Sequence, residues 1–256
     1  MTDGNPIPKS GTLSLLSLGY RGLEAWRAAR GTDWIETRRL EALALSEAAA
    51  TDAPPSGSPG GAAGEVIVVT GVPRSGTSML MQMLQAGGVR PFTDEARGPD
   101  ENNPRGYLEH ARVKSMLEDA SWLRDADGCA VKVVAPLATH LPEGPAYRVV
   151  LIERDLDEVI QSQARMLERS DRPSADATTL RQVYRQQIAK THAWMREAPR
   201  TRALRIQHRT IVTDPAGAAE RLAAFLEGAA ALGGAPFDAS AAAAAVDPAL
   251  YREHRL

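Results

Sequence analysis

The stretch that decides the fold is EVIVVTGVPRSGTSMLMQML, residues 65–84. The apolar run 66–69 is typical of a strand in a parallel sheet, and the Met- and Leu-rich pattern after Gly76 is typical of a helix. A tight turn rich in Gly, Pro and Ser joins the two. This order of elements directs the backbone N–H groups at the start of the helix toward an anion.

The turn itself, GVPRSGTS at residues 71–78, has the glycine spacing of a phosphate-binding loop. Thr77 stands where the usual nucleoside-triphosphate motif has its phosphate-binding lysine. Two glycines alone would also fit an ordinary strand-to-helix turn. Because the loop carries Arg74 and three hydroxyl side chains between a strand and a helix, we interpret it as an anion-binding site.

The sequence before this unit has a different character. Residues 51–64, TDAPPSGSPGGAAG, have the composition of a flexible linker. Two amphipathic helical patterns precede it, so residues 1–50 are interpreted as an amino-terminal helical arm and residues 65–256 as the main domain. We favour packing of the arm on the main domain; a homodimer or a docked partner through its helices is the alternative.

Length and composition limit the class of protein. A chain of 256 residues with net charge −2 can form one α/β domain and has no general attraction to nucleic acid or to an anionic membrane. A single cysteine, Cys129, excludes an internal disulfide, and no Cys/His spacing is that of a zinc site, so we expect no metal. No apolar stretch could span a bilayer and no signal peptide is recognisable, so a soluble cytoplasmic protein is expected.

The segment after the first helix, residues 89–110, is polar, rich in turn residues and densely charged. We interpret it as a long functional loop, because loops of this length in α/β domains usually serve a site. A helical pattern follows over residues 110–124. Runs of β-branched residues at 129–134 and 147–152 then predict two further strands of a parallel sheet.

The strand predicted at 147–152 leads into a second strand-to-helix corner, ERDLDEVIQS at residues 153–162. Arg154 follows the strand directly, and Ser162 lies two turns into the helix that starts at Leu156. In open α/β sheets ligands bind at the carboxyl ends of the strands, so the two corners can serve one ligand. Taken alone, Arg154 also fits a surface salt bridge and Ser162 an ordinary helix position.

The remaining pattern completes an α/β order. Residues 170–179 resemble a mobile loop, residues 180–197 a helix, residues 203–207 a strand, and the helix that Asp214-Pro215 begins runs to about residue 227. We therefore predict an α/β fold, with a P-loop-type three-layer α/β/α arrangement around a central parallel sheet.

The two corners, GVPRSGTSMLMQML and RDLDEVIQS, together with LRIQHRTIVTDPAGAAERLAAFL at 204–226, resemble sulfotransferases that use 3′-phosphoadenosine 5′-phosphosulfate (PAPS). The resemblance covers about residues 65–228. The loop is most similar to the tyrosylprotein sulfotransferase branch and to bacterial sulfotransferase-like proteins. The resemblance implies a cofactor site in which the first loop binds the 5′-phosphosulfate and the second corner the 3′-phosphate, through Arg74, Ser75, Gly76, Thr77, Ser78, Arg154 and Ser162.

The resemblance implies transfer of a sulfuryl group, in line, from PAPS to an acceptor hydroxyl that the sequence does not identify. Such an enzyme aligns the reactants and stabilises charge on the oxygens around sulfur. Arg74 would neutralise the leaving 5′-phosphate electrostatically, because an arginine does not release a proton at neutral pH.

A base for the acceptor hydroxyl is implied in the same way. The tyrosylprotein branch has a catalytic Glu twenty-one positions after the loop Arg, a count that leads from Arg74 to Glu95. Asp94 and Glu109, in the same polar loop, stay open as candidates, with His110 a weaker one. The histidines at 140, 192, 208 and 254 are interpreted as structural or surface residues.

Two other functions remain alternatives. A kinase-like or ATP-hydrolysing enzyme would keep the loop, but Thr77 in the lysine position and the lack of an acidic strand end for Mg²⁺ disfavour it. A non-catalytic nucleotide-binding protein that acts through its amino-terminal helices is the second alternative.

Overall fold

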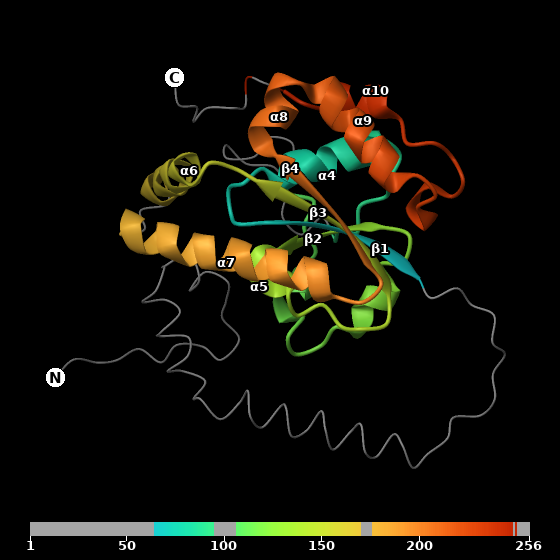
Figure 1. The fold of residues 1–256 in the computed structure, drawn as a ribbon, viewed down its shortest axis with the longest axis horizontal. Helices are drawn as coiled ribbons and strands as arrows, with labels where there is room; N and C mark the ends of the chain where they lie inside the picture. Colours follow the sequence, from blue (N-terminus) through green and yellow to red (C-terminus); the bar gives the residue numbers. More distant parts are fainter. Residues whose placement is uncertain (1–63, 95–105, 170–175, 248, 250–256) are drawn as a thin grey trace, which may run out of the picture. The chain divides into compact units, whose positions relative to one another are not determined.

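The computed structural model describes residues 64–94, 106–169, 176–247 and 249. The helical arm predicted for residues 1–50 and all of the predicted linker except Gly64 lie outside this set. The described chain contains a sheet, the helices on its two faces, and the loops at the carboxyl ends of the strands (Figure 1).

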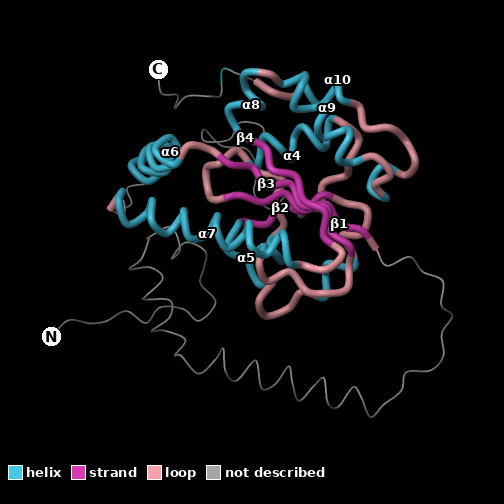
Figure 2. Tube along the Cα trace, in the orientation of Figure 1, coloured by secondary structure: helices cyan, strands magenta, loops and turns pink. Residues whose placement is uncertain are grey.

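The sheet has four parallel strands in the order β2-β1-β3-β4 within the described residues. They are β1 (Glu65–Gly71), β2 (Ala130–Val134), β3 (Ala146–Glu153) and β4 (Thr201–Gln207). The central strands β1 and β3 are nearly continuous runs of buried residues, as expected when both faces of a parallel sheet are covered. The helices lie on either side of the strands in the tube view (Figure 2).

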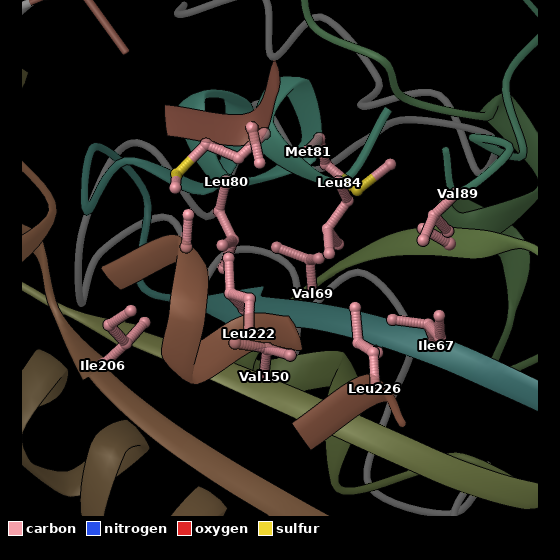
Figure 3. Packing of buried hydrophobic residues seen from close by; sticks show 14 of the residues in the cluster. Ile67, Val69, Leu80, Met81, Leu84, Val89, Val150, Ile206, Leu222 and Leu226 are labelled. Carbon is pink, nitrogen blue, oxygen red and sulfur yellow. The ribbon is translucent and has the colours of Figure 1, made fainter. Parts of the chain in front are cut away.

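One face of the sheet is covered by α4 (Thr77–Ala86), α8 (His208–Thr213), α9 (Pro215–Leu226) and α10 (Ala239–Ala244). Alternate residues of each strand point to this face, because side chains of a strand alternate between its two sides. Figure 3 shows the resulting cluster, which includes Ile67, Val69, Leu80, Leu84, Val150, Leu222 and Leu226.

The opposite face is covered by α5 (Ala135–Ala138), α7 (Ala177–Glu197) and two 3-10 helices, η1 (Ala111–Ser115) and η2 (Ser121–Arg124). The other alternate strand residues lie in this second cluster, for example Val66, Val68, Val149 and Leu151. Helices on both faces of a parallel sheet make three layers. The predicted α/β fold with a central parallel sheet is therefore confirmed.

Helix α6 (Leu156–Arg169) starts directly after β3 and packs on α7 through a third cluster, which contains Val159, Leu180 and Tyr184. Val72, the second residue of the first loop, belongs to this cluster as well. The helix of the second corner is thus tied to the loop of the first.

The single helix predicted over residues 110–124 is wrong, since η1 and η2 are separated by turns. The side chain of Asp119 accepts a hydrogen bond from the Ser121 N–H at 2.8 Å, and such local bonds compete with helix continuation. Helix α7 begins at Ala177, three residues earlier than predicted, because the Asp176 side chain accepts from Thr179 N and caps it.

The helix predicted from Asp214-Pro215 is confirmed as α9, and Gly87 follows the last residue of α4 as predicted. The Ala- and Gly-rich sequence after α9 forms η3 (Ala230–Leu232) and α10. Among the helices of the described residues, none has the length and apolar character needed to cross a membrane.

Candidate functional site at the carboxyl ends of the strands

The loop between β1 and α4 has a backbone that its sequence dictates. Gly76 precedes the helix with φ 103°, a conformation that favours glycine, and a Cβ there would lie 2.6 Å from Cδ2 of His208. Arg74 also adopts a positive φ, 68°, which is uncommon for a residue with a side chain. Within the described structure no side chain caps Gly76, and the first turn of α4 has no acidic residue, so its N–H groups suit an anion.

The two corners predicted from the sequence contact each other. Nε of Arg74 donates to Oγ of Ser162 at 3.0 Å, across 88 positions of sequence. Nη1 of Arg154 donates to the backbone oxygen of Arg74 at 3.3 Å. Because β1 and β3 are neighbours in a parallel sheet, the loops that follow them lie at the same end of the strands. This brings Arg74, Arg154 and Ser162 together.

Arg154 is held by a carboxylate of α6, the helix that begins two residues after it. Its Nε lies 2.9 Å from Oε2 of Glu158, and the two side chains are only 7% and 10% exposed. Ser162 is buried. The ion pair of Arg154 is therefore buried and not a surface salt bridge, and Ser162 is a buried helix position whose hydroxyl contacts Arg74.

His208 lies against the loop, although the sequence analysis left it outside the site. It is the first residue of α8 and is 6% exposed. Burial and, to a smaller extent, the nearby positive charge of Arg154 lower its pKa to about 4, although Glu158 opposes the shift. The imidazole is therefore neutral at pH 7, and it adds volume beside Gly76 without adding charge.

Lys132 contacts the first loop, although it was not among the residues predicted from the sequence. It lies in β2, is 8% exposed, and donates from Nζ to Oγ of Ser78 at 2.9 Å. The same nitrogen donates to Oε1 of Glu109 at 2.9 Å and to the backbone oxygen of Tyr107 at 3.2 Å. A lysine inside the apolar run CAVKVV was the available signal, because a buried lysine is nearly always paired.

The hydroxyl residues of the loop differ in their surroundings. Ser75 is fully buried and its Oγ lies over Gly71, where an added Cβ would collide with it and lie 2.8 Å from the backbone oxygen of Ile152. Thr77 is buried at the start of α4, and Ser78, next to it, accepts from Lys132. Ser78 therefore connects the loop to the neighbouring strand β2.

The candidate bases have separate positions. Glu109 pairs with Lys132. Asp94 accepts from the backbone N–H of Ala111 at 2.7 Å, and its Oδ2 lies 3.7 Å from Nδ1 of His110. Glu95, the first candidate from the resemblance, lies outside the described residues.

His110 belongs to a stack of aromatic rings next to Asp94. Its ring lies 4.4 Å from that of Phe92 and 6.1 Å from that of Trp122, with nearly parallel planes. Its Nδ1 accepts from the backbone N–H of Arg112 at 3.2 Å, which places the proton of a neutral ring on Nε2. This stack fixes the start of η1 beside Asp94.

Two groups of side chains therefore flank the first loop: Arg74, Arg154 and Ser162 on the side of β3, and Ser78, Lys132 and Glu109 on the side of β2. Three cations close to a helix N-terminus can bind an anion with more than one negative charge. Within the described ranges, no group of three or more His, Cys, Asp or Glu side chains could hold a metal ion.

Comparison with known proteins gives one family match. Residues 118–229 match the model of the sulfotransferase family, a range that includes Arg154 and Ser162 but not the first loop. A search of curated proteins found no match.

Several solved structures are similar in shape, at low identity. The sulfotransferase domain from the curacin biosynthetic pathway is 15% identical, with a TM-score of 0.41, 73% of this chain covered and 89% of that one. The sulfotransferase from Alicyclobacillus acidocaldarius is 12% identical, with a TM-score of 0.39 and coverages of 68% and 84%. For the sulfotransferase domain from the Synechococcus PCC 7002 olefin synthase, these values are 18%, 0.44, 80% and 92%.

Proposed function

The chain carries the sequence pattern of the sulfotransferase family over residues 118–229, and on this premise we propose that it transfers a sulfuryl group from PAPS to a hydroxyl acceptor. The observation that carries the proposal is the contact of the two corners, where Arg74 donates to Ser162 at 3.0 Å. Two anion-binding corners side by side suit a nucleotide that has phosphate groups at both ends.

The first corner has the features that a phosphosulfate group requires. The loop offers the uncapped start of α4 and the guanidinium of Arg74, and Lys132 adds an ammonium at Ser78. The missing side chain of Gly76 leaves room for His208, which a Cβ there would meet. These features fit the 5′ end of the donor.

The second corner fits a phosphate monoester at the 3′ position. Arg154 is buried and oriented by Glu158, and the Ser162 hydroxyl lies within hydrogen-bonding distance of Arg74. An arginine that is already held in place loses little side-chain freedom when an anion binds. His208 stays neutral beside it, so the positive charge of this corner comes from the two arginines.

In the proposed reaction, PAPS supplies the activated sulfuryl group. The bond between sulfur and the 5′-phosphate oxygen breaks, a bond between sulfur and the acceptor oxygen forms, and the hydroxyl proton passes to a base. Arg74 and Lys132 stabilise the negative charge on the leaving phosphate and on the oxygens around sulfur. The base is one of the carboxylates of the polar loop, Glu95, Asp94 or Glu109.

Calorimetric titration with 3′-phosphoadenosine 5′-phosphate (PAP), the coproduct, tests the site directly. We expect binding by the wild type, and binding that is weaker by about ten- to a hundredfold in Arg154→Ala, because a charge-assisted hydrogen bond to phosphate is lost. Arg112→Ala is the matched control, since Arg112 is exposed and its ion pair is with Asp125, which is not a residue of either corner.

The proposal fails if the wild type does not bind PAP at millimolar concentration, or if ATP with Mg²⁺ raises the melting temperature more than PAP does. The transfer step has its own assay. Transfer of radiolabelled sulfate to a panel of phenols, sugars and peptides, with Arg74→Ala as the blank, identifies the acceptor class.

A further inference from the structure

Lys132 has three hydrogen-bond acceptors around its ammonium: Oγ of Ser78, the backbone oxygen of Tyr107 and Oε1 of Glu109. They come from the loop between β1 and α4, called the donor loop from here on, and from the carboxyl-terminal end of the polar loop. An ammonium has three protons, and each of these acceptors, all from described residues, can take one of them. The side chain of Lys132 is 7% exposed and that of Glu109 is 28% exposed, so the pair is partly shielded from water.

The backbone of residues 107–109 is shaped to this arrangement. Leu108 adopts φ 48°, in the left-handed region that a leucine rarely occupies. This turn directs the backbone oxygen of Tyr107 and the side chain of Glu109, two residues apart, to the same nitrogen. Thr93 Oγ1 donates to the backbone oxygen of Glu109 at 2.9 Å and holds the segment from the other side.

Glu109 is consequently close to the donor loop. Its carboxylate and the Ser78 hydroxyl each lie one hydrogen bond from the same nitrogen, so they are at most two hydrogen-bond lengths apart. An anion bound at Ser78 would lie near this carboxylate and would be repelled by it. The anion and the carboxylate would also compete for the single positive charge of Lys132.

From this competition we infer that Glu109 is a positioning residue that sets the affinity for the sulfuryl donor through Lys132. The inference rests on the proposed function, and it removes Glu109 from the candidate bases. Glu109 holds the ammonium at Ser78 when the loop is empty, and it opposes the donor's negative charge when the loop is filled. The base is then Glu95 or Asp94.

The test is a double-mutant cycle on the binding of PAPS, titrated by calorimetry without an acceptor. Glu109→Gln removes the carboxylate charge and keeps its shape, and we expect about tenfold tighter binding of PAPS. In the Lys132→Met background the same substitution should bring much less gain, because the ammonium for which the two anions compete is absent. Asp125→Asn, which removes an exposed, ion-paired carboxylate, is the matched control and should not change the affinity.

A second variant covers the case in which Glu109→Gln does not fold. Glu109→Asp keeps the charge but draws it back from Lys132 by one methylene, and it should tighten PAPS binding by less than the glutamine does. A residue that acts only as a base gives a different result, namely unchanged PAPS affinity and turnover that is lost over the whole pH profile.

The outcomes separate the inference from the proposed function. Unchanged or weaker PAPS binding by Glu109→Gln, beside a wild type that binds, overturns the inference alone. A gain of equal size in the Lys132→Met background also overturns it, because the whole effect of the carboxylate would then be direct repulsion of the donor and none of it would pass through Lys132. A wild type that does not bind PAPS overturns the proposed function and this inference together.

Discussion

His208 combines three properties that make its titration measurable. It is 6% exposed, it lies against Gly76 of the loop, and Arg154 is close enough to lower its pKa. The pKa is about 4 in the folded protein, compared with about 6.5 in an unfolded chain. The unfolded state therefore binds a proton between these values while the folded state does not.

We expect the free energy of unfolding to fall as the pH drops from about 6.5 to 4, by up to about 3 kcal/mol from this residue. Above pH 6.5 both states are neutral at His208, so the residue adds no pH dependence there. Urea unfolding of the wild type and of His208→Gln at pH 7 and pH 5 measures the difference. Equal losses of stability in the two proteins would contradict this assignment; His140→Gln, an exposed histidine, should behave as the wild type.

At the scale of single elements, the sequence and the structure agree best where a local pattern decides the element. The strand, loop and helix of residues 65–84 and the cap at Asp214 follow from apolar runs, glycine spacing and capping residues. The contact of Arg74 with Ser162 could be anticipated too, since adjacent parallel strands end at one edge.

The pairing of Lys132 with Glu109 could not be anticipated in this way. It depends on the positive φ of Leu108 and on the path of the polar loop, and neither has a periodic pattern. The helix predicted over residues 110–124 was wrong for a related reason: the hydrogen bond that the Ser121 N–H donates to the Asp119 side chain outweighs the apolar spacing. Long-range ion pairs and local side-chain bonds thus account for most of the differences.

The cap of α9 gives a prediction for a single helix. The Asp214 side chain accepts from Gly217 N at 2.9 Å, and Pro215 occupies the first turn. Asp214→Ala should lower the free energy of unfolding by about 1 kcal/mol, because a helix N–H group loses its acceptor. Asp214→Asn, which can still cap, should retain most of the stability in urea unfolding; an equal loss in both variants would show that the cap bond does not matter.

In the described structure, the contacts of the candidate site and a buried ion pair that stabilises the fold lie at opposite ends of the strands. The contact between the two corners lies at the carboxyl ends of the strands. At the amino ends, a buried ion pair joins β1 and β3. There Nε of Arg148 lies 2.8 Å from Oε1 of Glu65, and Nη1 donates to the backbone oxygen of Phe225 at 2.6 Å. Oε2 of Glu65 accepts from Ala230 N at 3.0 Å, so the pair also holds the ends of α9 and η3 against the sheet.

Arg148→Met should lower the free energy of unfolding by about 2 to 3 kcal/mol, because Glu65, one-fifth exposed, would keep its charge without its cation. Arg112→Met removes the arginine of a pair that is more than half exposed, and it should cost less than about 1 kcal/mol. Adding Glu65→Gln to Arg148→Met should restore part of the loss, since the uncompensated charge is gone. The pair lies at the amino ends of the strands and the loop lies at their carboxyl ends. The PAP affinity of the folded variants should therefore equal that of the wild type. Weakened PAP binding by Arg148→Met, measured under conditions in which the variant is fully folded, would mean that the amino and carboxyl ends of the strands are energetically coupled.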